Sequence, residues 1–148
     1  MEIIICSDHA GADYKKDVAA FIKELGFDCL ECGANSLDIP VDYPLVMKEM
    51  TDYVLKNDGA LGIFMCGTGI GGSIAGNKIK GIRAALCHNE YTARMAREHN
   101  NANVLCVGAR VLTITEVKEV IKSFLSAKWS NEERHIRRLK EIEDLEKL

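Results

Sequence analysis

The sequence predicts an α/β fold, a three-layer Rossmann-like arrangement with a doubly wound sheet of five parallel strands and an extra helix at the C-terminus. Short apolar, β-branched runs alternate five times with longer amphipathic segments, and several of the runs are almost continuously apolar. Such runs are typical of parallel strands that helices cover on both faces. Alternating strands and helices then wind into right-handed crossovers.

The five strands are expected at 2–6, 27–31, 60–65, 82–87 and 103–107. Amphipathic helices are expected between and after them, at about 11–25, 41–57, 71–79, 90–99 and 113–127. Gly26, Gly59 and Gly81 stand where helices should end and strands begin. A last helix, at about 131–147, has Ser130 or Asn131 as its expected N-cap.

Length and composition indicate a single globular domain that spans residues 1–148. The 47% of hydrophobic and 28% of charged residues are ordinary for a globular protein, and no linker or repeat divides the chain. A net charge of -3 gives no reason to expect nucleic acid or an anionic membrane as a partner. We expect a cytoplasmic protein, because a strand-like run begins at Glu2 and no apolar stretch is long enough to span a bilayer.

The six cysteines are expected to be reduced thiols rather than a disulfide framework. Cys29 and Cys32 have C-x-x-C spacing, which leaves a redox or metal role open. However, this pair ends a strand instead of opening a helix, and no second pair completes a zinc site. We therefore interpret these two, with Cys6, Cys87 and Cys106, as small core residues, and we expect no metal.

Residues capable of chemistry follow directly after the expected strands. Asp8 and His9 follow the first strand, Cys66 follows the third, and Arg110 follows the fifth. Ligands of doubly wound sheets bind beyond the carboxyl ends of the strands. Asp8 could orient His9 or accept from sugar hydroxyls, although an Asp in this position could equally be a helix N-cap.

The glycine-rich turn CGTGIGGS, which begins at Cys66, carries the main functional signal. Glycines let successive backbone N–H groups point into one concavity beside a helix N-terminus, which suits phosphate, carboxylate or an oxyanion. A thiol that faces such donors is expected to have a lowered pKa. Proton abstraction beside a carbonyl fits this arrangement, because the amides and the Thr68 hydroxyl would stabilise the enediolate.

Other interpretations of the turn remain open on the residues alone. Gly67, Gly69 and Gly72 match the G-x-G-x-x-G dinucleotide fingerprint, and Glu90 follows at a tolerable distance. The turn could also bind phosphate without catalysis, belong to a cysteine hydrolase, or join a strand to a helix with no ligand.

Four further candidates lie away from this turn. Tyr43 could stack on a sugar or simply pack, and His99 ends the expected fourth helix, where a His is also a common surface feature. Arg134 and Arg138 are i and i+4, so both project from one helix face. Two guanidinium groups on one face suit a phosphate dianion, whereas neighbouring glutamates offer a plain surface alternative.

Six blocks of the sequence form a pattern that can be compared with known families: Ser7–Gly11, Asp42–Pro44, Cys66–Lys78, Gly81–Ala84, His99–Leu105 and Gly108–Arg110. Together they resemble the type B ribose-5-phosphate isomerases, a family that includes subunits of galactose-6-phosphate isomerase. The similarity runs from Ser7 to at least Arg138.

The resemblance implies an aldose–ketose isomerase of the pentose phosphate pathway that uses neither metal nor cofactor. It would interconvert ribose 5-phosphate and ribulose 5-phosphate through a cis-enediolate. A hexose 6-phosphate, such as allose or galactose 6-phosphate, is the competing substrate. The resemblance also implies a homodimer with active sites at the subunit interface, and leaves open whether dimers pair into tetramers.

The resemblance also implies roles for individual residues. Cys66 would be the base that moves a proton between C1 and C2, His99 would help to open the furanose ring, and Asp8 would handle sugar hydroxyls. Asn100 would contact the sugar, and Tyr43, which belongs to one of the six blocks, stays a substrate-binding candidate on its residue type. The anion hole would comprise Gly67, Thr68, Gly69, Ile70 and Gly71. The phosphate end would be lined by His9, Arg110, Arg134 and Arg138, some of them from the partner subunit.

Overall fold

The computed structural model describes residues 1–148. The strands are β1 (Glu2–Ser7), β2 (Asp28–Gly33), β3 (Leu61–Cys66), β4 (Ala84–Leu86) and β5 (Val104–Gly108). The helices are α1 (Ala12–Glu24), α2 (Tyr43–Lys56), α3 (Ile70–Asn77), α4 (Glu90–Glu98), α5 (Ile114–Ser126) and α6 (Glu133–Leu145), and a short 3-10 helix (His9–Gly11) precedes α1. Every expected strand and helix is present, with ends displaced by at most two residues.

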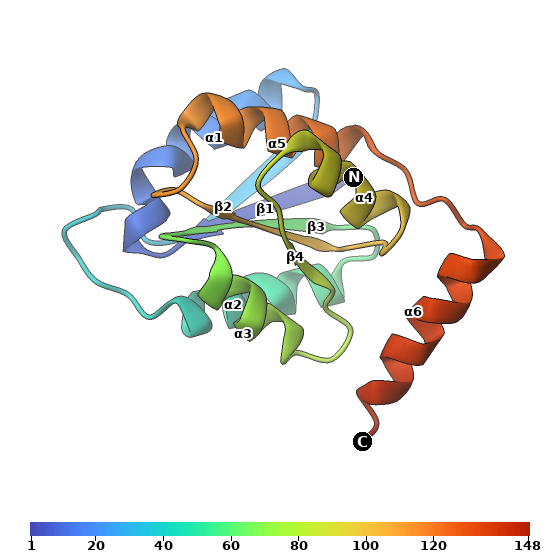
Figure 1. Cartoon of the computed structure of the whole chain (residues 1–148). Coiled ribbons are helices and arrows are strands. Elements are labelled where there is room, and N and C mark those ends of the chain that lie inside the picture. The colour runs from blue at the N-terminus through green and yellow to red at the C-terminus, as the bar shows by residue number, and fades with distance from the viewer.

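The five strands form one parallel sheet in the order β2-β1-β3-β5-β4. Helices α1, α4 and α5 cover one face and α2 and α3 cover the other, so the three-layer prediction is confirmed (Figure 1). Residues 61–66 of β3 and 104–108 of β5 are buried throughout because both strands lie inside the sheet.

Alternation along the central strands divides the core into two layers. Ile3 and Ile5 pack under α1 and α5, whereas Ile4 and Cys6 belong to the layer under α2. This is the period-two geometry of a strand, in which successive side chains point to opposite faces. The apolar runs of the sequence are continuous because each strand must supply both layers.

The expectation that all six thiols are reduced is wrong at one pair. Cys6 of β1 lies directly opposite Cys32 of β2, with their Cα atoms 4.6 Å apart, and the structure joins them as a disulfide. This Cα separation is within the range that a disulfide can bridge. Cys29 remains unpaired, so the C-x-x-C spacing forms no bond of its own, and Cys87 and Cys106 are buried core residues as expected.

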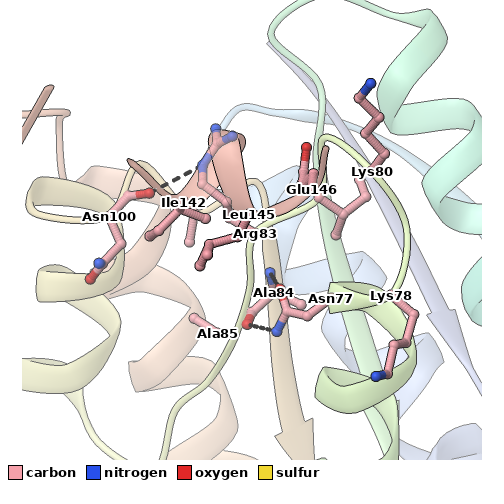
Figure 2. A pocket seen from close by; sticks show the side chains of 12 residues that line it. Asn77, Lys78, Lys80, Arg83, Ala84, Ala85, Asn100, Ile142, Leu145 and Glu146 are labelled. Carbon is pink, nitrogen blue, oxygen red and sulfur yellow. Dashed lines mark hydrogen bonds between the residues drawn. The ribbon is translucent and has the colours of Figure 1, made fainter. Parts of the chain in front are cut away.

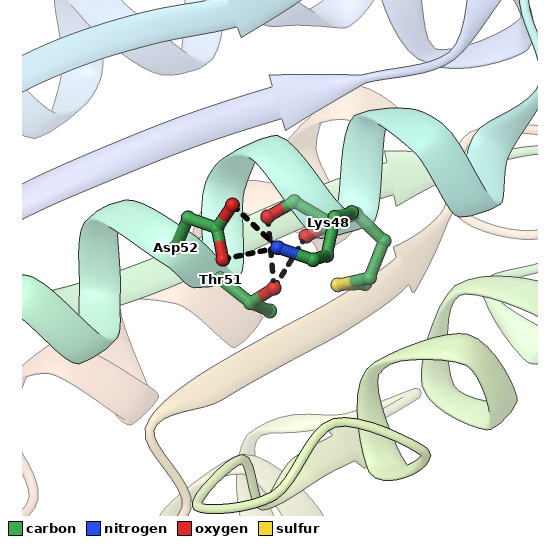
Figure 3. A network of polar contacts seen from close by, with 4 residues as sticks. Lys48, Thr51 and Asp52 are labelled. Carbon is green, nitrogen blue, oxygen red and sulfur yellow. Dashed lines mark hydrogen bonds and ion pairs between the residues drawn. The ribbon is translucent and has the colours of Figure 1, made fainter.

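The solvent-facing side of α2 carries polar side chains together with exposed apolar ones such as Leu45 and Leu55. Lys48 and Asp52 form an exposed i, i+4 ion pair, and Thr51 donates from its hydroxyl to the carbonyl oxygen of Met47 (Figure 3). The hydroxyl of this buried threonine is therefore satisfied within its own helix. No helix of the chain combines the length and the apolar character that crossing a bilayer requires.

Helix α6 stands away from the sheet (Figure 1). Its N-cap is Glu132 rather than Ser130 or Asn131, since Asn131 adopts a positive φ of 55° and the Ser130 hydroxyl turns to His135 instead. His135 is the buried residue of the helix, and Glu146 just beyond its end accepts from the backbone N–H of Gly81. These contacts attach both ends of the helix to the body of the protein.

Candidate active site

The turn after β3 folds tightly because glycine occupies its critical position. Gly69 is the N-cap of α3 and has a φ of +79°, in the left-handed region. A Cβ atom there would also stand 2.5 Å from Cδ1 of Leu86 and 3.0 Å from the backbone carbon of Val107. Both backbone conformation and close packing therefore require glycine. The Thr68 hydroxyl accepts from the N–H of Ile70 and lies on the same turn.

The thiol of Cys66 lies at the start of this turn and is 4% exposed. Burial raises its pKa, while hydrogen bonds from the backbone N–H groups of Gly72 and Gly69 lower it in part. The charge of Asp8 raises the pKa further, and the N–H of Thr68 again opposes this. The expectation of a lowered pKa is therefore wrong, because lost hydration outweighs the donors of the turn. Three backbone N–H groups of the turn nevertheless act on the sulfur, as expected for donors beside it.

Asp8 and His9 lie next to the end of β3. The buried Asp8 caps the short helix that follows, because its Oδ1 accepts from the N–H groups of Ala10 and Gly11 at 2.9 and 3.3 Å. His9 accepts at Nδ1 from the N–H of Val41 at 3.2 Å. This contact leaves the ring proton on Nε2, which can donate to a ligand.

Two further candidates reach the same edge of the sheet from other elements. Tyr43, the first residue of α2, packs so closely on Gly71 that a Cβ atom there would lie 2.6 Å from its Cζ. Arg110 donates from its backbone N–H to the carbonyl oxygen of Gly67, and its guanidinium group lies beside the same glycine. One edge of the sheet therefore gathers one group of candidates: Asp8, His9, Tyr43, Cys66, Gly67, Thr68, Gly69, Ile70, Gly71 and Arg110.

The remaining candidates lie at the opposite edge of the same sheet. His99 is the C-cap of α4, and the backbone N–H of Gly62, near the start of β3, donates to the carbonyl oxygen of Asn103. Cys66 stands four residues further along β3, about 13 Å away at the rise of an extended strand. His99 and Asn100 therefore do not meet Cys66 within one chain.

A buried histidine, His135, contacts two members of this second group. The His99 ring stacks on that of His135 with centroids 4.3 Å apart, and Nε of Arg134 lies 3.4 Å from Nε2 of His135. His135 is 3% exposed, and its Nδ1 lies 2.6 Å from the Ser130 hydroxyl. Burial, followed by the charges of His99 and Arg134, lowers the pKa of His135. The second group comprises His99, Asn100, Arg134 and Arg138, and the charge of Arg138 also acts on His135.

Arg83 fixes the turn that carries His99, a contact that the sequence analysis did not assign. Its Nε donates to the carbonyl oxygens of Asn100 and Asn101 at 3.2 and 3.0 Å, and its Nη2 donates to Asn101 at 2.9 Å. Figure 2 shows Arg83 and Asn100 in one pocket with Ile142 of α6. In the sequence, Arg83 was marked only by its place in the Gly81–Ala84 block. Nothing in that block indicates that its side chain binds the carbonyl oxygens of residues 100 and 101.

A thiol and a glycine turn at the carboxyl edge of a doubly wound parallel sheet place the protein in the class of α/β proteins that bind a ligand beyond the ends of their strands. The chain belongs to the Ribose/Galactose Isomerase family, whose model matches residues 3–142. The expected family and fold are therefore confirmed.

Its relatives within the family include proteins named ribose-5-phosphate isomerase B. The chain is 42% identical over 146 residues to the probable ribose-5-phosphate isomerase B of Mycoplasma genitalium, covering 98% of this chain and 95% of the relative. It is 35% identical over 147 residues to ribose-5-phosphate isomerase B of Mycobacterium leprae, covering 99% and 91%.

Solved structures agree. Type B ribose 5-phosphate isomerase from Trypanosoma cruzi matches with a TM-score of 0.94 at 39% identity, covering 99% of both chains. The Mycoplasma genitalium enzyme with bound ribulose-5-phosphate matches with a TM-score of 0.93 at 42% identity, covering 99% of this chain and 96% of that one. By family, the chain is an aldose–ketose isomerase.

Proposed function

We propose that this chain interconverts ribose 5-phosphate and ribulose 5-phosphate through a cis-enediolate, with Cys66 as the general base. The observation that carries the proposal is the position of the Cys66 sulfur among the backbone N–H groups of Gly72, Gly69 and Thr68. The Mycoplasma genitalium relative, solved with bound ribulose-5-phosphate, supports this choice of substrate.

In the aldose-to-ketose direction, the Cys66 thiolate removes the proton from C2 of the open-chain sugar. The electron pair moves through the C1–C2 bond onto O1, and the resulting enediolate is held by the N–H groups of residues 67–71 and the Thr68 hydroxyl. Each well-placed donor contributes about 3 kcal/mol to such a transition state. The thiol then returns the proton to C1, while the hydroxyl proton of O2 passes to O1.

Asp8 would handle the sugar hydroxyls. Its Oδ1 is engaged by two backbone N–H groups, which holds the carboxylate in place and leaves Oδ2 to accept from the sugar. His9 and Arg110 lie at the same edge and would bind the phosphate through the His9 Nε2–H and the guanidinium group. Tyr43 would contact the sugar over Gly71.

We further propose a homodimer in which each site is completed by the partner's second group. The separation of His99 from Cys66 along β3 supports this, because ring opening and proton transfer must act on one sugar. Helix α6 exposes the apolar side chains of Ile136, Ile142 and Leu145, which a second copy would cover in part. The partner would thereby supply His99 for ring opening, Asn100 for the sugar, and Arg134 and Arg138 for the phosphate.

The first test is turnover by the purified, chelator-treated chain of ribose 5-phosphate, allose 6-phosphate and galactose 6-phosphate. Conversion of ribose 5-phosphate to the ketose is expected, with Cys66→Ala abolishing turnover but retaining sugar-phosphate binding. Cys29→Ala is the matched control, because Cys29 is half-buried in β2 outside the site. Undiminished turnover by Cys66→Ala would remove the proposed base, and a preferred hexose phosphate would replace the proposed substrate.

A further inference from the structure

Lys15 is a buried cation that the proposed reaction does not use. It lies on α1, is 2% exposed, and has no carboxylate within ion-pair distance. Its Nζ instead donates to the carbonyl oxygens of Cys32 and Ala34 at 2.9 and 2.5 Å, and to Oδ1 of Asn35 at 3.0 Å. An ammonium group has three N–H donors, so these three oxygens satisfy it completely.

This arrangement is costly for the protein to maintain. Burial lowers the pKa of Lys15, and the charges of Glu31 and Glu49 oppose this only from a distance. An apolar side chain of similar shape would avoid the desolvation penalty of a buried charge. A lysine at this position is therefore better explained by the chain segment to which its three acceptors belong than by a contribution to stability alone.

All three acceptors belong to the end of β2 and the segment that follows it. Residues 34–42 contain no helix or strand, and they connect β2 to α2. The start of the segment is fixed by Lys15, and by Ser7, which accepts from the N–H of Ala34 at 2.8 Å. A segment without regular structure depends on such contacts for its position.

Two contacts of the candidate site are made at the far end of this segment, one by Val41 and one by Tyr43, the first residue after it. The N–H of Val41 donates to Nδ1 of His9 and thereby selects its ring tautomer. Tyr43 follows immediately and packs on Gly71 of the glycine turn. A displacement of residues 34–42 would therefore change His9 and Tyr43 together.

We propose that Lys15 is a positioning residue whose buried ammonium group fixes segment 34–42, so that Val41 holds His9 as the Nε2–H tautomer and Tyr43 stays over Gly71. The effect of Lys15 on His9 is inferred from the hydrogen bonds of Lys15 and of Val41, without any assumption about the reaction. Its effect on substrate affinity rests on the proposed function.

The experiment compares Lys15→Met, which retains an apolar side chain of similar length, with Lys16→Met at the exposed neighbouring position. Ring ¹⁵N chemical shifts of His9, assigned against a His9→Gln variant, report its tautomer. The parent chain and Lys16→Met should show one tautomer with the proton on Nε2, and Lys15→Met should show a mixture. For ribose 5-phosphate, Lys15→Met should raise KM about tenfold and leave kcat within about twofold.

If Lys15→Met does not fold, Asn35→Ala removes one acceptor and should shift both readouts in the same direction by a smaller amount. The proposal would be overturned if Lys15→Met folds and gives the same His9 spectrum as the parent chain, even with a lower melting temperature. If Lys15→Met does not fold, the same result for Asn35→Ala would overturn it. The spectrum needs no substrate. Absence of isomerase activity in the parent chain would thus refute the proposed function while leaving the role of Lys15 to be decided by the His9 tautomer.

Discussion

Cys66 and His99 lie at opposite edges of one parallel sheet. Cys66 is the last residue of β3. His99 follows α4 and precedes β5, and β5 begins at Val104, which lies beside the start of β3. A helix that follows a parallel strand runs back toward the amino edge, so its C-terminus must lie opposite the strand's carboxyl end. Two residues of one proposed reaction are thus separated by the fold itself.

Complementation between inactive subunits is expected from this separation. Cys66→Ala and His99→Asn homodimers should each have little activity. After unfolding and refolding together, half of the dimers should be mixed. In the proposed homodimer Cys66 and His99 of one site come from different subunits, so each mixed dimer should hold one intact site. Recovery of about one quarter of the parent activity is therefore expected in a ribose 5-phosphate assay.

The control for complementation is a mixture of Cys66→Ala with Thr68→Ala. Both residues belong to the same turn, so mixed dimers hold no intact site and no recovery is expected. Equal recovery in the two mixtures, or none in either, would contradict a site that combines residues of two subunits.

The raised pKa of Cys66 predicts activity that increases with pH. The base must be a thiolate, and burial favours the protonated thiol, so the active fraction of free enzyme grows as pH rises. The logarithm of kcat/KM should rise with a slope of about one per pH unit through neutral pH, beyond the ordinary thiol pKa of about 8.5. Alkylation of Cys66 by iodoacetamide should follow the same profile. A plateau of both rates below pH 7 would contradict this.

Much of this architecture is predictable because its signals are local. Continuous apolar runs predict the buried strands, and the glycine turn beside Cys66 predicts the carboxyl-edge site from topology alone. The position of His99 follows from the same rule, since a residue at the end of a crossover helix faces the other edge. The sequence blocks place it in the family pattern but do not state which subunit supplies it.

Other features depend on distances that the sequence does not contain. The prediction of a lowered pKa for Cys66 is wrong because it took account only of the hydrogen-bond donors, which the glycine pattern reveals. The depth at which the thiol is buried cannot be read from the sequence, and this burial raises the pKa. The pairing of Cys6 with Cys32 depends on the register between β1 and β2. The contacts of Lys15 and Arg83 join segments far apart in the chain, and nothing in their local patterns marks them as anchors.

Arg83→Met should weaken the turn that carries His99. The variant removes the hydrogen bonds to the carbonyl oxygens of Asn100 and Asn101 while keeping an unbranched side chain. Unfolding free energy should fall by about 1 kcal/mol, measured by urea denaturation. Because His99 is proposed to open the ring, kcat should fall more for ring-closed ribose 5-phosphate than for an open-chain analogue.

Lys80→Met is the matched control for Arg83, because Lys80 is exposed and close by in the chain. It should leave both stability and the ratio between the two substrates unchanged. A fall in stability of Arg83→Met with an unchanged substrate ratio would show that Arg83 supports the fold without positioning His99.

Gly71→Ala tests whether Tyr43 contacts the sugar. The added Cβ would stand 2.6 Å from Cζ and 2.9 Å from the hydroxyl oxygen of Tyr43, so the ring must move. If its present position serves binding, Gly71→Ala and Tyr43→Ala should each raise KM for ribose 5-phosphate about tenfold, and the double variant should be no worse than either. Tyr91→Ala, on exposed α4 surface, should leave KM unchanged. Additive effects in the double variant would mean that Gly71 acts without Tyr43. An unchanged KM of Tyr43→Ala would mean that the ring packs on Gly71 without contacting the substrate.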